Sequence, residues 1–285
     1  MYSTHAFLGK IKVENSKEPI VCGVINLSPE SFFKGSVIHE EEKLTKTVEK
    51  MIINGAKIID VGAQSTRPHQ IYGGNEKINE KKELERIQNA LPIIMDVISS
   101  FNGIELSVDT FRASVANFAL QNGVQIINDV TGLKNDVNLG KLVGEFNASI
   151  VLMASNKEPG DISSAEEGIN ALKQSINIAL KEGISEKKIV IDPGFGGWQG
   201  RPWEIDREIF QKLEDFKSIG KPLFVGVSRK STVGIPTNRK NPNERLAGTI
   251  ALTSLLIEKE IAVIRAHDVP ETIDTIKIVN AFLNE

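Results

Sequence analysis

Cysteine is almost absent from this chain of 285 residues, and its scarcity excludes two kinds of chemistry. With Cys22 as its single cysteine, the chain can form neither an intramolecular disulfide nor a thiolate metal cluster. Cys22 stands in the apolar run IVCGVI, which is typical of a small buried hydrophobic residue. Histidine is scarce as well, and His5, His39, His69 and His267 do not follow a metal-ligand spacing.

Strong net charge and long apolar runs are also missing. A formal net charge of −3 gives no bulk attraction to nucleic acid or to an anionic membrane, so any phosphate chemistry must come from a local site. No apolar stretch approaches the roughly 18–20 residues that a membrane helix needs, and the N-terminal segment lacks a signal-peptide core. GxSxG, P-loop and HExxH motifs are absent too. We therefore expect a cytoplasmic protein that binds neither nucleic acid nor membrane.

What the chain does have is a repeating alternation from Ile20 onward between short β-branched runs and longer amphipathic segments. Most of the short runs are nearly continuous in Ile, Val and Leu, as in parallel strands that are covered on both faces. Between them, residues such as Leu44, Val48 and Met51 recur at helical spacing. The predicted strands are 20–26, 57–62, 104–109, 124–129, 148–154, 188–192, 222–227 and 261–267.

Eight strand–helix units in about 265 residues predict an α/β fold in which a single (β/α)8 TIM barrel closes. An open doubly wound sheet is the alternative, but it usually carries a glycine-rich phosphate turn after its first strand. Here the first strand is followed by NLSPESFFKGS, and the later GFGGWQG block follows Pro193 without opening a helix. We predict the barrel over residues 20–285, with residues 1–19 as an N-terminal extension.

Polar residues stand at the ends of the predicted strands, where the catalytic groups of such a barrel lie. Asp109, Asn128 and Asp192 offer carboxylate and amide groups to a flat, NH-rich heterocycle on one side. The fifth strand ends in the apolar pair Met153-Ala154. The other side is cationic and suits phosphate or carboxylate oxygens; it comprises Asn26, Arg67, Ser228, Arg229, Lys230, Arg265 and His267.

The segment IAVIRAHDVP places Arg265 and His267 two residues apart at the end of a strand, so that both face the same side. We predict that this pair faces an anion such as pyrophosphate. A salt bridge from either residue to Asp60 or Asp129 is the alternative.

Seven segments in order, from about Val21 onward, resemble the dihydropteroate synthase family. These segments are GVINLSPESFFKGS with Asn26, IIDVGAQSTRP with Thr66 and Arg67, SVDT with Asp109, IIND with Asn128, DPGFG with Asp192, VGVSRKSTVG with Ser228 to Lys230, and RLAGT followed by RAHDV.

The resemblance implies that 6-hydroxymethyl-7,8-dihydropterin diphosphate binds and that an arylamine displaces its pyrophosphate. It implies that Asp109, Asn128, Asp192 and Lys230 hold the pterin beside Met153, and that Asn26 helps to hold Mg²⁺ on the diphosphate. The resemblance further implies a homodimer. The predicted catalytic residues are Arg265, His267 and Lys230, and Thr66, Arg67, Ser228 and Arg229 are predicted to contact substrate.

Three positions depart from the family pattern. Ala154 stands where the family has His, Gly197 replaces the second aromatic of the Gly-Phe-Gly-Phe loop with Trp198 one place on, and Gln64 replaces Glu. These changes suggest a different amine, such as a ribosylated aminobenzene phosphate in a methanopterin pathway. A pterin-binding paralogue without turnover and a methyltransferase domain acting on a reduced folate are the alternatives, although the latter has no need of the anion-binding residues.

Overall fold

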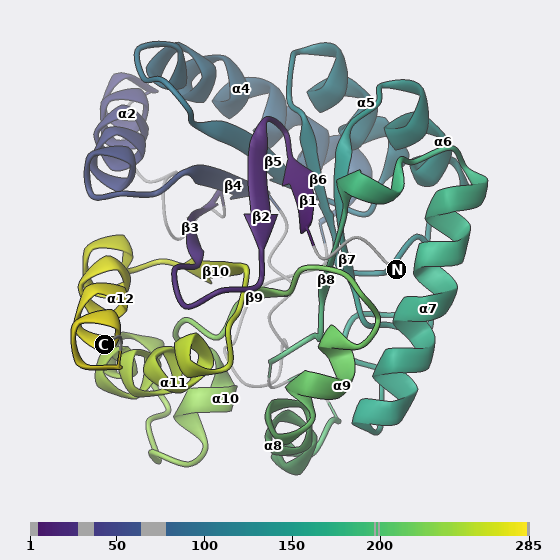
Figure 1. Cartoon of the computed structure of the whole chain (residues 1–285). Helices are drawn as coiled ribbons and strands as arrows, with labels where there is room; N and C mark the ends of the chain where they lie inside the picture. The colour runs from purple at the N-terminus through teal and green to yellow at the C-terminus, as the bar shows by residue number, and fades with distance from the viewer. Residues whose placement is uncertain (1–4, 28–36, 64–77, 197, 199, 284–285) are drawn as a thin grey trace.

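Eight parallel strands close into a ring surrounded by helices (Figure 1), which confirms the predicted barrel. The structure, a computed structural model, describes residues 5–27, 37–63, 78–196, 198 and 200–283, so the predicted site residues Thr66 and Arg67 lie outside it. The strand order is β8-β7-β6-β5-β4-β3-β10-β9. The ring is completed between its first and last strands by a parallel bridge from Ile191 to Leu223, where the Ile191 N–H donates to the Pro222 carbonyl over 3.1 Å.

Each predicted strand is present, with ends that differ by a few residues. The seventh shrinks most, to the two residues that form the ladder with β10. The eight strands are β3 (Ile20–Asn26), β4 (Ile58–Gly62), β5 (Glu105–Asp109), β6 (Ile126–Asp129), β7 (Ser149–Met153), β8 (Ile189–Asp192), β9 (Phe224–Val225) and β10 (Val263–Ala266).

The helices lie outside the ring, and several begin at side chains that satisfy the free N–H groups of the first turn. Asn79 accepts from the Lys82 N–H, and Ser164 accepts from the Glu167 N–H. The helices are α2 (Val37–Ile53), α4 (Glu80–Ser99), α5 (Ala113–Gln121), α6 (Val137–Glu145), α7 (Ala165–Lys181), η1 (Glu186–Lys188), α8 (Trp203–Gln211), α9 (Leu213–Lys217), α10 (Ser231–Gly234), η2 (Pro242–Glu244), α11 (Leu246–Glu258) and α12 (Val269–Leu283). Within the described ranges no helix is both long and apolar enough to cross a membrane.

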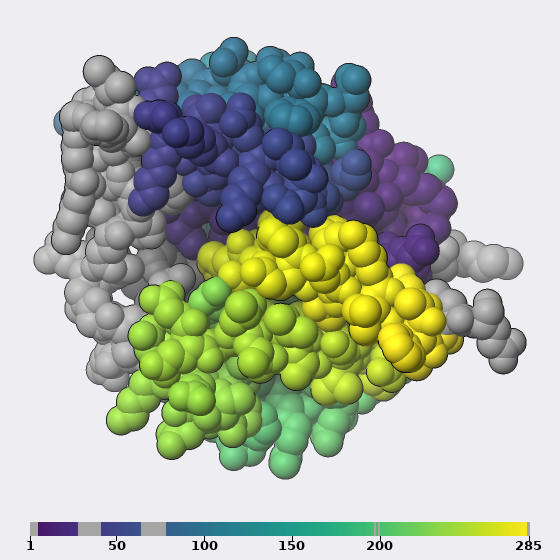
Figure 2. Space-filling model, turned by 90° about the vertical axis from the view of Figure 1, so that its left-hand side faces the viewer, coloured from purple at the N-terminus to yellow at the C-terminus, as the bar shows by residue number. Residues whose placement is uncertain are grey.

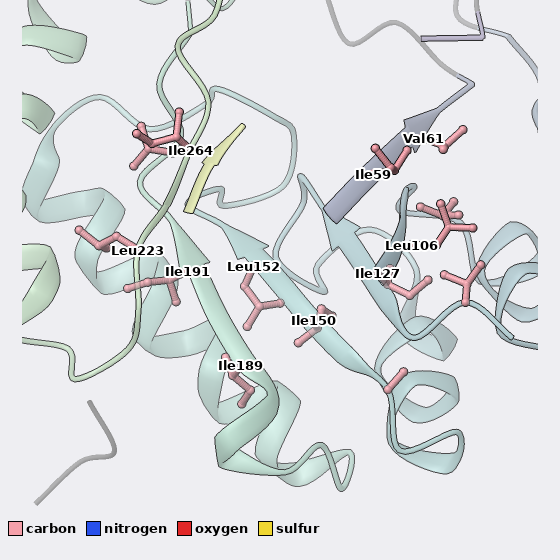
Figure 3. Close-up of a cluster of buried hydrophobic side chains, with 14 of the residues drawn as sticks. Ile59, Val61, Leu106, Ile127, Ile150, Leu152, Ile189, Ile191, Leu223 and Ile264 are labelled. Atoms are coloured by element: carbon pink, nitrogen blue, oxygen red, sulfur yellow. The ribbon is translucent and has the colours of Figure 1, made fainter. Parts of the chain in front are cut away.

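Successive side chains of each strand alternate between the outer core and the barrel interior. The outward set packs against the helices, and Figure 3 labels several of its members, including Ile59, Leu106 and Ile127. Ile58 and Ile126, which directly precede Ile59 and Ile127 in the sequence, belong to a second cluster inside the barrel. The same alternation points the polar ends of the strands into the barrel's mouth.

A β-hairpin that the sequence analysis did not predict closes the opposite end of the barrel. It consists of β1 (His5–Leu8) and β2 (Ile11–Glu14) and lies in front of the ring of strands in Figure 1. Its fully buried Leu8 joins the interior cluster that contains Cys22. The turn is anchored where the Gly9 N–H donates to Ser149 Oγ over 3.1 Å. One end of the barrel is therefore an apolar plug, and chemistry is confined to the other.

Candidate active site

The strand register brings the predicted polar residues to one level of the barrel interior. Gly62, Asp109 and Asn128 are neighbours across β4, β5 and β6, and Met153 pairs with Asp192 across β7 and β8. Because interior positions recur every second residue, the carboxyl ends of these strands present their side chains to a shared mouth.

Arg265 forms the centre of the interior network. Its Nε donates to Asp60 Oδ2 over 2.6 Å, and its Nη2 donates to Asp109 Oδ2 over 2.9 Å. Asp60, which is fully buried, also accepts from Ser107 Oγ at 2.6 Å and from Asn128 Nδ2 at 3.1 Å. A buried carboxylate with three donors is well satisfied, as a buried charge must be.

This network corrects the prediction that acids and cations occupy separate sides of the mouth, since Arg265 contacts Asp109 directly. The salt bridge to Asp60 that the sequence left as an alternative for Arg265 is also present. Nη1 of Arg265 nevertheless has no hydrogen-bond partner within the described part of the chain. One face of the guanidinium is therefore left for a ligand.

The charges of the network are set by burial. Burial raises the pKa of Asp109 to about 7, although the Arg265 guanidinium opposes the rise. Burial alone would lower the pKa of Arg265, but the carboxylates of Asp60 and Asp109 outweigh it and raise that pKa, so the guanidinium stays charged.

His267, Ser228 and Asn26 form a second group at the rim. Asn26 Nδ2 lies 3.2 Å from His267 Nε2, and His267 Nδ1 lies 3.1 Å from Ser228 Oγ. With the amide nitrogen placed so, Nε2 accepts and Nδ1 carries the proton that it donates to Ser228. The Asn26 amide oxygen is then turned away from the imidazole.

The Asn26 amide oxygen is a candidate ligand for a metal ion, but the other described residues offer little support for a metal site. They contain no group of three or more His, Cys, Asp or Glu side chains that could hold a metal ion. Mg²⁺ usually keeps several waters and takes oxygens from substrate phosphates, so it needs few protein ligands. Asn26 therefore fits as one ligand of a metal–phosphate complex, and not as a free-standing metal site.

Lys230 extends from the loop after β9 toward Asp192. Its Nζ donates to the Phe195 carbonyl over 2.7 Å and lies 5.8 Å from the centre of the Trp198 ring. Burial lowers the pKa of Lys230 to about 8, although the Asp192 carboxylate opposes the fall. Burial also raises the pKa of Asp192, whose Oδ1 accepts from the Gly194 N–H at 2.7 Å.

Arg229 does not contact this group; the prediction that it binds substrate stays a prediction, and its guanidinium is paired with Asp268. Its Nε and Nη2 each donate to Asp268 over 2.7 Å, and its Nη1 donates to the carbonyls of Pro242 and Asn243. A bidentate pair of this kind fixes geometry strongly. Arg229 therefore holds the loop after β9 against the start of α12.

Of the three positions that depart from the family pattern, the structure describes only Ala154. Met153 faces the interior, but Ala154 is fully buried in the outer core that packs against the helices. Its methyl group therefore does not reach the mouth. Gln64 and Gly197 lie outside the described residues.

Two interior residues, Asp60 and Ser107, were missed as site members. Asp60 entered the sequence analysis only as an alternative salt-bridge partner. The signal that could have found both is the alternation itself, because each stands two positions before Gly62 or Asp109 on its strand.

Comparison with known proteins gives consistent matches over nearly the whole chain. Residues 22–267 match the family described as "Pterin binding enzyme". A dihydropteroate synthase from Clostridium beijerinckii is 35% identical over 265 residues, which cover 93% of this chain and 94% of that protein.

Solved structures agree with this match. The crystal structure of a dihydropteroate synthase from Clostridium difficile in the presence of pteroic acid superimposes with a TM-score of 0.82 at 32% identity, covering 95% of this chain and 99% of that one. A Xanthomonas albilineans dihydropteroate synthase with 4-aminobenzoic acid superimposes with a TM-score of 0.86 at 27% identity, and the match covers 99% of each chain.

The interior network predicts a large stability cost for Asp60→Asn. The amide would leave the buried Arg265 guanidinium without half of its countercharge, so we expect the free energy of unfolding in urea to fall by about 3–5 kcal/mol. Ser107→Ala is the matched control, because it removes one hydrogen bond to the same carboxylate and should cost about 1–3 kcal/mol. Equal costs for the two variants would show that the ion pair contributes nothing beyond its hydrogen bonds.

Proposed function

This chain belongs to the dihydropteroate synthase family of pterin binding enzymes and is a transferase, and from that premise we propose that it condenses 6-hydroxymethyl-7,8-dihydropterin diphosphate with 4-aminobenzoate in folate biosynthesis. The observation that carries the proposal is the meeting of Asp109, Asn128 and Lys230 with Arg265 in one barrel mouth. Acids for a pterin edge and cations for a diphosphate are thereby within reach of a single substrate.

In the proposed complex the pterin ring lies among the interior acids. The 2-amino group and the neighbouring ring N–H donate to a carboxylate, which gives a paired interaction with strong discrimination. Asp109 suits this role because one of its oxygens carries the bond to Arg265 and the other remains for the ligand. The Lys230 ammonium donates to an acceptor of the ring, and Met153 offers an apolar surface beside Asp192.

The proposed reaction is a substitution at the methylene carbon. The arylamine nitrogen supplies the electron pair of the new C–N bond, the C–O bond to the diphosphate breaks, and pyrophosphate leaves with those electrons. The amine then loses a proton to solvent. Because the pterin ring delocalises positive charge at the methylene, no protein nucleophile is needed, and the protein's contribution is to orient the substrates and stabilise the leaving anion.

The leaving diphosphate is proposed to lie at the rim formed by Arg265, His267 and Asn26. Arg265 Nη1 would contact its oxygens, His267 would orient the Asn26 amide through Nε2, and the amide oxygen of Asn26 would hold Mg²⁺ bound to the phosphates. The metal would neutralise charge on the leaving group.

We propose 4-aminobenzoate rather than a ribosylated amine as the acceptor. The Xanthomonas albilineans relative was solved with 4-aminobenzoic acid. In addition, Ala154, one of the residues that suggested a bulkier amine, lies in the outer core instead of the mouth. The ribosylated aminobenzene phosphate is kept as the competing substrate in the test.

The test measures pyrophosphate release with the pterin diphosphate, Mg²⁺ and each amine separately. We expect release with 4-aminobenzoate, and kcat/KM for the ribosylated phosphate lower by about tenfold or more, because a site shaped for the smaller amine has no room for the added sugar. Preference for the ribosylated amine would overturn the acceptor assignment. Binding of the pterin without release would favour the paralogue that lacks turnover.

The pKa values of the site predict a bell-shaped pH profile for kcat/KM. Asp109 must be ionised to accept N–H donors, so activity should rise as the pH passes about 7. Lys230 must be charged to donate, so activity should fall as the pH passes about 8. Asp109→Asn should remove the acid limb and lower kcat/KM by about 100-fold. An acid limb that survives in this variant would assign it to another group.

We also propose that the chain forms a homodimer through α11 and α12, which Figure 2 shows side by side in yellow-green and yellow. Exposed large apolar residues gather on these helices, including Leu255 at 49%, Ile278 at 60% and Phe282 at 82% exposure. Several exposed large apolar side chains on two adjacent helices suit an interaction site, and the family relationship supports a second copy as its occupant.

The dimer is tested by a charge on that face. Ile278→Glu is expected to convert the dimer to a monomer in size-exclusion chromatography with light scattering, because a carboxylate would be buried without a partner. Val137→Glu is the control, since Val137 is 84% exposed on α6 across the barrel. A wild-type protein that is already monomeric at the loading concentration would contradict the assignment.

A further inference from the structure

Trp198 packs against the loop after β8, whose Phe195 carbonyl accepts a hydrogen bond from Lys230. Its indole Nε1 donates to the Gly194 carbonyl over 3.0 Å, and Lys230 Nζ lies 5.8 Å from the ring centre. The same Nζ donates to the carbonyl of Phe195, the next residue along. The indole and the ammonium are thus tied to adjacent carbonyls of one loop.

Two glycines make room for this indole. Gly160, in the loop between β7 and α7, has a φ of 82°, and a Cβ there would overlap with Cβ and Cγ of Trp198. A Cβ on Gly196 would lie 3.0 Å from the indole Nε1. The ring therefore sits directly on backbone, with no side chain between it and either loop.

Hydrogen bonds hold the described residues of both loops. In the first, Asp161 accepts the N–H groups of Asn156 at 2.8 Å, Lys157 at 2.7 Å and Glu158 at 3.0 Å. In the second, Arg201 Nη2 donates over 2.8 Å to each of the Gly194 and Gly196 carbonyls. Asp206, in the first turn of α8, forms an ion pair with Arg201.

We infer that Trp198 is a positioning residue for Lys230: seated on Gly160 and bonded to Gly194, its indole forms the wall that keeps the Lys230 ammonium on the Phe195 carbonyl and turned toward Asp192. The inference deepens the proposed function, on which the role of Lys230 in binding the pterin rests.

The physical need for such a wall comes from the lysine itself. A lysine side chain has many rotamers, and the entropy lost on fixing one of them opposes holding it in one geometry. The face of an indole attracts a cation and so offsets part of that cost. The ring also shields the ammonium from water, and burial is the largest cause of the lowered pKa of Lys230.

Trp203 provides a matched control within the same chain. It too donates its indole N–H to a backbone carbonyl, that of Thr232 in α10 at 2.9 Å, and it too lies near a cation, with Arg207 6.0 Å from its ring centre. Within the described part of the chain, the ring and carbonyl contacts of Lys230 are with Trp198 and Phe195, and not with Trp203. A general effect of losing a tryptophan should therefore appear in both sets of variants.

The first experiment measures Lys230 without measuring turnover. Trace acetylation across a pH series, quantified on peptides by mass spectrometry, gives the midpoint at which Lys230 becomes reactive, with the exposed Lys277 as internal reference. We expect a wild-type midpoint near 8 and an upward shift of at least about one pH unit in Trp198→Ala, because water then solvates the ammonium.

The conservative variants separate positioning from folding. Trp198→Phe keeps a ring over the ammonium and should keep the midpoint, and Trp203→Phe should leave it unchanged. Gly160→Ala should shift the midpoint as Trp198→Ala does, because the methyl group displaces the indole, and should add no further shift when combined with Trp198→Ala. An unshifted midpoint in Trp198→Ala, or equal shifts in the Trp198 and Trp203 variants, would overturn the inference.

Kinetics then connect the wall to the proposed reaction. Trp198→Ala is expected to raise KM for the pterin diphosphate by about tenfold and to move the basic limb of the pH profile upward, with kcat reduced less. A wild-type protein that releases no pyrophosphate would refute the proposed function, while the acetylation midpoints would still decide the inference.

Discussion

The site depends on the burial of Arg265 between two carboxylates. Burying Asp60 and Asp109 inside a barrel would be prohibitively costly without a cation in contact with both, and Arg265 supplies two separate nitrogens for them. The partners are unequal, because Asp60 receives further donors from Ser107 and Asn128. Asp109 is thus left with an incompletely satisfied carboxyl and a raised pKa, which is the state a ligand with N–H donors would complete.

The ion pair between Arg265 and Asp60 spans the strand β3 that lies between them, and this explains why the sequence could not reveal it. Arg265 pairs in register with Cys22 on β3, and Asp60 lies beyond it on β4. Cys22, which the sequence marked as a buried hydrophobic residue, is buried in the barrel interior as predicted. The strands and their inward-facing ends followed from period-two alternation, whereas distances across the interior depend on how the ring closes.

Other differences have similar local causes. The hairpin of residues 5–14 escaped prediction because its strands are four residues each and mix polar with apolar side chains. Arg229 adjoins Lys230 in sequence, but its guanidinium pairs with Asp268, a contact that the sequence does not indicate. Ala154 was placed at the mouth, although it stands one residue after the inward-facing Met153 and so faces outward.

Binding and protonation are linked in a mouth built this way. A ligand edge that donates N–H groups to Asp109 favours its ionised form and drives a proton off it when the pH is below about 7. A ligand acceptor placed at Lys230 favours its charged form and draws a proton on when the pH is above about 8. Between those values both groups already carry the charge that binding requires, so a pterin would bind there with little net proton exchange. The opposite pKa shifts of these two residues, both caused first by burial, thus define the narrow pH range in which both side chains already carry the charges that a pterin would require.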